Sequence, residues 1–304
     1  MKNFLKLIRV ENLVMIALMQ IIVRYTFLNF AGLIHGFSDL NYALLIIATI
    51  CIAAAGYIIN DIYDVEVDYI NKPDRVYVRK TISEKMAFNW YFALNIIGVG
   101  IGVYLSNQVN RSAVAAIFVI CSALLYVYSN GLKQIPLVGN AIIAFLASTS
   151  IIVIILFNIF PYMFGFNNDQ MTNMMHFLLQ YAVMAFLINF AREMVKTIEN
   201  YEGDLACGIS TSATYFGINP TKLLISFTLA GLLGFLIYFI YNNIFHLTYV
   251  IIYFLVAIFT PILFVVIKLI QAKEKSDFSF ISKFLKVIML AIMFSITAIV
   301  FLSN

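Results

Sequence analysis

Apolar residues are gathered along this chain into runs of about 20 residues, the length that an α-helix needs to cross the hydrocarbon core of a bilayer. The runs lie near residues 12–34, 41–60, 85–105, 112–129, 137–159, 174–191, 221–241, 248–267 and 284–302. Polar and charged residues are concentrated between them. The pattern predicts an all-α, polytopic membrane protein with nine transmembrane helices. The first run is too long for the core of a signal peptide, so we expect it to remain as the first span.

The basic residues predict the orientation of the chain in the membrane. If the N-terminus is cytoplasmic, all of the 19 Lys and Arg residues except Arg24 and Arg111 fall on the cytoplasmic side. Cytoplasmic loops carry an excess of Lys and Arg, so we expect a multi-pass integral membrane protein with the N-terminus inside and the C-terminus outside.

The composition agrees with a protein whose main partner is the lipid bilayer. The chain is 63% hydrophobic and 11% charged, whereas soluble domains carry about 25% charged residues. A water-soluble enzyme is therefore excluded. The net charge is only +4 and the basic residues are dispersed, so we expect no nucleic-acid partner. Three scattered cysteines, at positions 51, 121 and 207, form neither a disulfide framework nor a CxxC metal site.

Acidic residues also lie on the predicted cytoplasmic side, apart from Asp39 and Asp169. Most belong to residues 61–84 and 193–204, which begin where the second and sixth predicted helices end. The positive-inside rule hardly constrains Asp and Glu, so this placement predicts a cytoplasmic active site. Four spans separate the two segments, which indicates two four-helix pseudo-repeats plus a final helix within a single membrane-embedded domain, residues 1–304.

The first acidic segment begins Asn60-Asp61-Ile62-Tyr63-Asp64-Val65-Glu66-Val67-Asp68. If the second helix continues through it, Asp61, Asp64 and Asp68 share one face. Carboxylates placed in this way suit Mg²⁺, which is commonly held by one or two carboxylates together with the phosphates of a substrate. The alternative is a solvated loop, but these carboxylates adjoin a bilayer that penalises charge.

The second acidic segment has a four-residue period. A continuous helix would place Arg192, Lys196, Asn200 and Asp204 on one stripe, so that two cations, an amide and a carboxylate follow one another. An exposed helix with ion pairs explains this segment almost as well when it is considered alone. Together the two segments predict a diphosphate site, in which carboxylates hold Mg²⁺ and basic side chains bind the remaining anionic oxygens.

These residues are similar to the motifs of the UbiA superfamily of intramembrane prenyltransferases. The NDxxDxxxD motif of that superfamily, with the Asn-x-Pro-x-Arg stretch after it, resembles Asn60, Asp61, Asp64, Asp68, Asn71, Pro73 and Arg75. Its second motif resembles residues 196–204 and the Gly-Ile-Ser-Thr run 208–211. Residues 128–140, around Lys133, resemble a loop that contacts diphosphate, and residues 9–13 resemble the substrate-facing entry to the first helix.

The resemblance implies an enzyme that transfers an isoprenyl chain from a prenyl diphosphate to a lipophilic acceptor, with Mg²⁺ as cofactor. The catalytic residues that it implies are Asp61, Asp64 and Asp204. The metal ligands would be Asp61, Asp64, Asp68, Glu199, Asn200, Glu202 and Asp204. The substrate-binding residues would be Asn12, Asn60, Asn71, Arg75, Lys133, Arg192 and Lys196. No obligate protein partner is predicted.

The chain also departs from the family pattern. Asn200 stands where the family usually has Asp, Thr197 where Asp is frequent, Gln134 where a second basic residue is usual, and Val76 where Pro is common. Glu199, Glu202 and Asp204 remain, so we expect a working metal site.

Two alternatives and one choice remain open. A non-catalytic relative that binds isoprenoid diphosphate would fit the loss of an Asp at residue 200. A transporter is less favoured, because its ionisable residues would lie near the middle of the helices. The acceptor is either an aromatic quinone precursor or a glycerol-phosphate lipid precursor, and no residue selects between the two.

Overall fold

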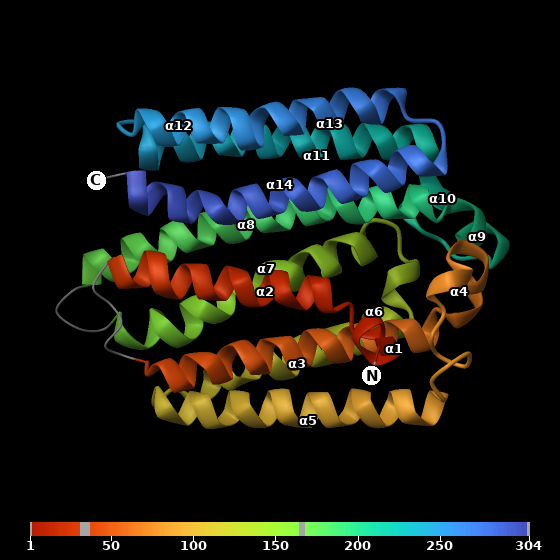
Figure 1. Ribbon diagram of the computed structural model, residues 1–304, viewed down its shortest axis with the longest axis horizontal. Helices are drawn as coiled ribbons and strands as arrows, with labels where there is room; N and C mark the ends of the chain where they lie inside the picture. The colour runs from red at the N-terminus through yellow and green to blue at the C-terminus, as the bar shows by residue number, and fades with distance from the viewer. Residues whose placement is uncertain (1, 31–36, 164–167, 303–304) are drawn as a thin grey trace. The chain divides into compact units, whose positions relative to one another are not determined.

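The computed structural model describes residues 2–30, 37–163 and 168–302, and these residues form helices without a β-strand (Figure 1). Nine of the helices within these ranges are long and apolar enough to cross a membrane. They are Val10–Leu28, Asp39–Tyr63, Glu84–Gln108, Ser112–Asn130, Val138–Tyr162, Asp169–Glu199, Ile218–Ile244, Thr248–Gln271 and Lys275–Leu302. The prediction of nine spans is confirmed. The end of the first predicted span, residues 31–34, lies outside the described residues.

The α-helices, in chain order, are α1 (Lys2–Leu7), α2 (Val10–Ile22), α3 (Asp39–Tyr63), α4 (Val65–Asn71), α5 (Glu84–Gln108), α6 (Ala116–Asn130), α7 (Val138–Asn158), α8 (Asn168–Glu199), α9 (Tyr201–Ala206), α10 (Ser212–Phe216), α11 (Ile218–Phe239), α12 (Thr248–Phe254), α13 (Thr260–Gln271) and α14 (Lys275–Leu302). Short 3₁₀ turns are η3 (Pro73–Arg75), η4 (Ser112–Ala115), η5 (Leu132–Gln134) and η6 (Phe160–Tyr162). Segments of π-helix are η1 (Val23–Leu28), η7 (Ile240–Ile244) and η8 (Leu255–Phe259).

The chain divides into two compact units. Unit 1 comprises Met1–Gln20, Ile34–Lys133 and Thr149–Leu178, and unit 2 comprises Ile21–Leu33, Gln134–Ser148 and Leu179–Asn304. The change of unit between Lys133 and Gln134 falls between the fourth and fifth spans, where the predicted pseudo-repeats meet. Three spans, which contain α2, α7 and α8, have residues in both units.

In unit 1, α3 packs along α5 and also contacts α6. Glycines permit these close approaches. A Cβ atom added to Gly98 would lie 3.2 Å from the carbonyl oxygen of Ala48, and one added to Gly56 would lie 2.6 Å from the side chain of Leu125. Small residues at such positions let helices approach closely, which is how helices associate in lipid.

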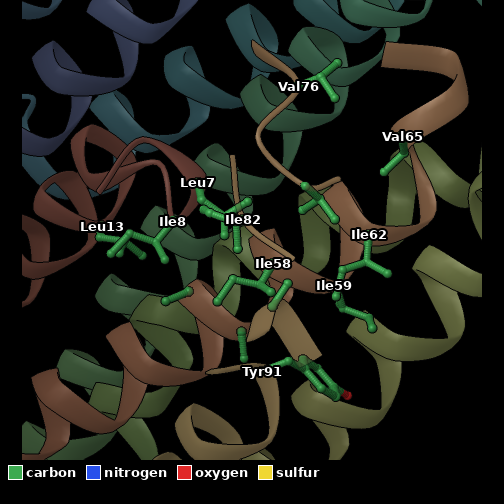
Figure 2. Packing of buried hydrophobic residues seen from close by; sticks show 14 residues of the cluster. Leu7, Ile8, Leu13, Ile58, Ile59, Ile62, Val65, Val76, Ile82 and Tyr91 are labelled. Carbon is green, nitrogen blue, oxygen red and sulfur yellow. The ribbon is translucent and has the colours of Figure 1, made fainter. Parts of the chain in front are cut away.

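A hydrophobic cluster in unit 1 surrounds the end of α3 that leads into the first acidic segment (Figure 2). Its members on α3 include Ile58, Ile59 and Ile62, and Leu7 of α1 and Tyr91 of α5 pack with them. Ile58 and Ile59 are fully buried. Close packing of this kind restricts side chains to few conformations, so the cluster holds the end of α3 in place.

In unit 2, buried aromatic side chains connect α8, α11, α12 and α14. The hydroxyl of Tyr181 forms a 2.6 Å hydrogen bond with Ser295 Oγ, and both groups are buried. The ring of Phe239 lies 5.4 Å from that of Tyr181 and 5.6 Å from that of Phe254. These contacts hold together the helices that flank the second acidic segment in the chain.

Candidate active site

The first acidic segment is interrupted at Asp64. The long helix α3 ends at Tyr63, Asp64 has φ −95° and ψ 3°, and α4 begins at Val65. The predicted continuous helix is therefore wrong at one residue. Backbone hydrogen bonds nevertheless join Asp64 N to Asn60 O at 2.9 Å and Asp68 N to Asp64 O at 2.8 Å. The four-residue connections of a helix are thus kept across the interruption.

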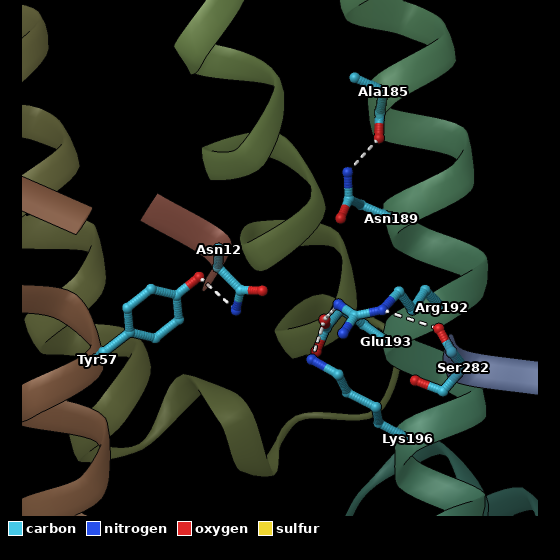
Figure 3. Close-up of polar contacts among 8 residues, drawn as sticks. All are labelled: Asn12, Tyr57, Ala185, Asn189, Arg192, Glu193, Lys196 and Ser282. Carbon is cyan, nitrogen blue, oxygen red and sulfur yellow. Dashed lines mark hydrogen bonds and ion pairs between the residues drawn. The ribbon is translucent and has the colours of Figure 1, made fainter. Parts of the chain in front are cut away.

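Asp61, the first carboxylate of the segment, is paired with Arg9. Arg9 lies between α1 and α2 with φ 51°, and its Nη2 donates a 2.7 Å hydrogen bond to Asp61 Oδ1. The guanidinium also lies over the ring of Tyr57, 4.9 Å from the ring centroid, which is the geometry of a cation–π contact. Asn12 Nδ2 donates to the hydroxyl of the same tyrosine at 3.1 Å (Figure 3).

Both carboxylate oxygens of Asp64 accept hydrogen bonds. Lys133 Nζ forms an ion pair with Oδ1, and Asn60 Nδ2 donates to Oδ2 at 2.7 Å. Lys133 belongs to η5, 69 residues further along the chain. The structure therefore brings the predicted lysine loop onto the first acidic segment, within unit 1.

Asp68 lies on α4 and is close enough to Asp64 and Asp61 to interact with their negative charges. Burial raises the pKa of Asp68 to about 6, and the negative charges of Asp64 and Asp61 contribute to this increase. Three residues further on, Asn71 is buried, and Arg75 is exposed in η3.

The second acidic segment is interrupted in the same way, at Asn200. Helix α8 ends at Glu199, Asn200 has φ −98° and ψ 7°, and α9 begins at Tyr201. Hydrogen bonds join Asn200 N to Lys196 O and Asp204 N to Asn200 O, each at 3.0 Å. The predicted unbroken stripe through residue 204 is wrong at Asn200, although its four-residue backbone connections persist.

The two predicted cations of the second segment share one carboxylate, that of Glu193. Lys196 Nζ donates to Glu193 Oε1 at 2.6 Å, and Arg192 Nη1 donates to the same oxygen at 3.4 Å (Figure 3). Arg192 Nε also donates to the carbonyl of Ser282 on α14, at 3.3 Å. This set lies within unit 2, and the carboxylate holds both cations near the end of α8.

The oxygen donors of the second segment differ in exposure. Asp204 is buried, Glu199 is half-buried and Glu202 is exposed. The amide oxygen Oδ1 of Asn200 is buried and accepts no hydrogen bond from the described residues. Because a buried acceptor without a partner is costly, this oxygen is suited to a donor or a cation that is supplied by a ligand.

The oxygen donors of each segment suit Mg²⁺ that is bound jointly by protein and substrate, and they do not suit a metal bound by protein side chains alone. Among the described residues, no three His, Cys, Asp or Glu side chains are grouped closely enough to hold a metal ion. The donors are carboxylate and amide oxygens, which hard cations prefer, and Mg²⁺ usually takes only one or two carboxylates together with substrate phosphates. The unpartnered oxygen of Asn200 agrees with this chemistry.

A cavity of about 370 Å³ is lined largely by residues of the first acidic segment in unit 1. Its polar wall includes Arg79, whose Nη1 donates to Glu66 Oε1 at 3.0 Å and whose Nε donates to Glu84 Oε2 at 2.8 Å. Apolar groups of Ile62, Tyr63, Val65 and Phe88 complete the lining. None of the predicted metal ligands lines this cavity, so we assign no metal to it.

Comparison with known proteins identifies the class to which this arrangement belongs. Residues 25–298 match the UbiA prenyltransferase family. The chain is 31% identical to digeranylgeranylglyceryl phosphate synthase of Saccharolobus solfataricus, over 94% of this chain and 93% of that protein. It is 32% identical to the synthase of the same name from Sulfolobus acidocaldarius, over 81% of this chain and 82% of that protein.

Solved structures share the fold. A structure concerned with digeranylgeranylglyceryl phosphate synthase in membranes has a TM-score of 0.65 and 24% identity, covering 98% of this chain and 97% of that chain. A UbiA homologue from Archaeoglobus fulgidus bound to DMAPP and Mg²⁺ has a TM-score of 0.61 and 15% identity, covering 95% and 99%.

The chain therefore belongs to the UbiA prenyltransferase family. It is a multi-pass membrane enzyme of the prenyltransferase class, as its sequence motifs predict.

Three residues that take part in these contacts were missed in the assignment of site residues from the sequence: Arg9, Tyr57 and Glu193. Tyr57 could have been found, because it lies one helical turn before Asp61 on α3 and so shares its face. Arg9 and Glu193 carry weaker signals, since charges at the inner ends of spans are common for reasons of topology alone.

Proposed function

We propose that this prenyltransferase transfers a geranylgeranyl chain from its diphosphate to a glycerol-phosphate lipid that already carries one such chain. The observation that carries the proposal is the similarity to digeranylgeranylglyceryl phosphate synthases, at 31% identity over 94% of this chain in one case. Their product is a glyceryl phosphate with two geranylgeranyl chains, so the acceptor must carry one. The glycerol-phosphate acceptor is thereby favoured over an aromatic quinone precursor.

The two acidic segments would serve this one reaction. Asp61, Asp64 and Asp68 would hold Mg²⁺ in the first, and Glu199, Asn200, Glu202 and Asp204 in the second. Bound Mg²⁺ would supply positive charge that stabilises the diphosphate as it leaves. Asp61, Asp64 and Asp204 are the carboxylates to which we assign the largest share of catalysis.

The basic side chains would bind the phosphate oxygens that the metal leaves free. Lys133 is paired with Asp64, and Arg192 and Lys196 are paired with Glu193. These pairs keep the cations in position. A diphosphate offers oxygens of the same kind as a carboxylate, so each cation can exchange its partner when the substrate binds.

The remaining substrate contacts are polar side chains of unit 1. Asn60 donates to Asp64 at 2.7 Å, which orients a proposed ligand. Asn12 is joined to Tyr57 at 3.1 Å, and we assign it to the acceptor side together with Asn71. Arg75 is exposed and would bind diphosphate as it arrives from water.

The chemical step breaks the allylic C–O bond of the donor and forms a bond from the acceptor hydroxyl oxygen to the same carbon. The hydroxyl proton must then leave. A site carboxylate that is not engaged by a cation, or the departing diphosphate, would accept this proton. No covalent intermediate with the protein is required.

We further propose that the active site opens to the cytoplasm, with the N-terminus inside and the C-terminus outside. The distribution of Lys and Arg supports this orientation. Prenyl diphosphates are anionic and water-exposed at their headgroup, so a cytoplasmic site would meet the substrate where the basic loops lie.

The test is an incubation of purified protein with labelled geranylgeranyl diphosphate, with and without Mg²⁺. One set of reactions contains geranylgeranylglyceryl phosphate as the acceptor and a matched set contains an aromatic quinone precursor. We expect a labelled two-chain glyceryl phosphate that forms only with Mg²⁺. Prenylation of the aromatic acceptor alone would overturn the proposed acceptor, and diphosphate binding without turnover on either would show a non-catalytic relative.

A further inference from the structure

A buried hydrogen-bond network in unit 2 joins the run after the second acidic segment to the loop that follows Lys133. Ser212, the first residue of α10, is fully buried. Its Oγ accepts a 3.0 Å hydrogen bond from the backbone N–H of Leu137 and donates a 2.5 Å hydrogen bond to Asn140 Oδ1. The function proposed above assigns no role to Ser212 or Asn140.

Ser212 is itself held firmly from both sides. Thr211 caps α10, and its side chain and that of Thr214 form a reciprocal capping box. The carbonyl of Ser212 accepts a 3.1 Å hydrogen bond from Thr221 Oγ1 of α11. A hydroxyl anchored in this way can impose a position on the loop that it contacts.

The loop residue that Ser212 contacts has a strained backbone. Leu137 has φ 62°, in the left-handed region that side chains other than glycine seldom adopt. The N–H of Val138 donates to the carbonyl of Pro136 at 2.8 Å, which closes a γ-turn around Leu137. A γ-turn with positive φ is rare and strained, and strained residues persist only where neighbouring groups hold them.

We propose that Ser212 is a positioning residue for Lys133. Leu137 follows Lys133 by four residues, and the tight turn that Ser212 and Asn140 hold constrains the C-terminal end of the preceding η5 turn. The network would thereby keep the ammonium of Lys133 ready for the diphosphate. This inference rests on the proposed function, because that function assigns Lys133 to the substrate.

The first arm of the test measures binding of a non-reactive geranylgeranyl thiolodiphosphate in the presence of Mg²⁺. Ser212→Ala should raise the dissociation constant by about ten-fold, the scale of loss when a group that orients a ligand is removed. Ser295→Ala is the matched control, since it also deletes a fully buried hydroxyl of unit 2. An equal loss in Ser295→Ala would indicate general loosening and overturn the inference.

The second arm is a double-mutant cycle with Lys133→Ala, which is expected to weaken binding on its own. If Ser212 acts through Lys133, Ser212→Ala should cause no further loss when Lys133 is already replaced. Additive losses would show that Ser212 acts by another route. Unchanged binding in Lys133→Ala itself would instead contradict the proposed role of Lys133, so the two failures can be told apart.

Asn140→Ala provides a second test of the inference if Ser212→Ala does not fold. It removes only the acceptor of the Ser212 hydroxyl and leaves the bond from Leu137 N–H. We expect a smaller loss of binding that also disappears in the Lys133→Ala background. A folded Asn140→Ala protein with undiminished binding would overturn the inference.

Discussion

Arg9 donates a 2.7 Å hydrogen bond to Asp61 across 52 residues of sequence, while its guanidinium lies over the ring of Tyr57. The carboxylate is largely buried, with 12% of its side chain exposed, whereas 38% of the arginine side chain is exposed. The pair thus ties the start of α2 to the end of α3 that leads into α4. It also holds a proposed metal ligand in one position before any ligand arrives.

We expect Arg9→Ala to lower the free energy of unfolding by about 1 kcal/mol, because it leaves Asp61 without its charged partner at a site that water partly screens. A double-mutant cycle with Asp61→Asn, followed by thermal unfolding in detergent, should give a coupling of similar size. Arg79→Ala removes a cation from exposed pairs and should change stability by less than about 0.5 kcal/mol. Zero coupling between residues 9 and 61 would contradict this account.

Asp61→Asn and Asp64→Asn should each give a folded protein in which Mg²⁺-dependent transfer falls by ~10²-fold or more, the scale of losing one electrostatic contact to the transition state. Initial rates at saturating Mg²⁺ provide the measurement. Asp74→Asn, which neutralises an exposed aspartate in η3, is the matched control and should retain most activity. Full activity in both site variants would remove the first segment from the mechanism.

The affinity for Mg²⁺ should rise with pH through the range around 6. Burial and the neighbouring carboxylates raise the pKa of Asp68 to about 6, so below that pH the metal must displace a proton. Titration of Mg²⁺ binding between pH 5 and 7.5 should show this increase in wild type and a flatter profile in Asp68→Asn. Identical pH profiles for the two proteins would argue against Asp68 as a ligand.

The same shift has the opposite effect on the stability of the metal-free protein. The folded state binds the Asp68 proton more tightly than the unfolded state does. This contribution to stability is therefore fully present at low pH and is lost as the pH rises through about 6. Mg²⁺ should restore the lost stability, which unfolding at pH 7.5 with and without the metal can measure.

Asn200→Asp should lower the Mg²⁺ concentration for half-maximal activity, or for diphosphate binding if the parent protein does not turn over. The amide oxygen Oδ1 is buried and accepts no hydrogen bond from the described part of the chain, and a carboxylate there would add negative charge beside the metal. The effect on rate has no fixed sign, because the same charge approaches the diphosphate. An unchanged Mg²⁺ requirement would show that residue 200 does not face the metal.

Glu66→Cys and Glu202→Cys test the proposed orientation. Both glutamates are exposed, so a thiol at either position should react with a membrane-impermeant maleimide. In a background without Cys51, Cys121 and Cys207, we expect labelling in inside-out vesicles and none in intact cells. Labelling from outside intact cells would reverse the topology.

The nine spans could be predicted from the sequence because lipid requires long, nearly uninterrupted apolar runs, and such runs leave little choice of structure. The interruptions of regular helix at Asp64 and Asn200 could not be predicted from the sequence. Each breaks regular helix at a single residue yet keeps the hydrogen bonds on both sides, and neither contains the Pro or Gly that usually marks a break.

The residue types of the candidate site could also be predicted from the sequence, but the ion pairs that these side chains form in the structure could not. The resemblance assigned Lys133 to diphosphate, and the structure pairs it with Asp64. Glu193 appeared only as one acid among several, and it accepts from both Lys196 and Arg192. Such partners depend on side-chain direction and on contacts between distant segments, which a local pattern does not encode.

Asp64 and Asn200 have nearly the same backbone angles, so the two acidic segments bend in the same way, but the charge at the bend differs. The first segment places a carboxylate at the bend and pairs it with Lys133, whereas the second places an uncharged amide there. The same backbone bend is therefore compatible with either a charged or an uncharged side chain at this position.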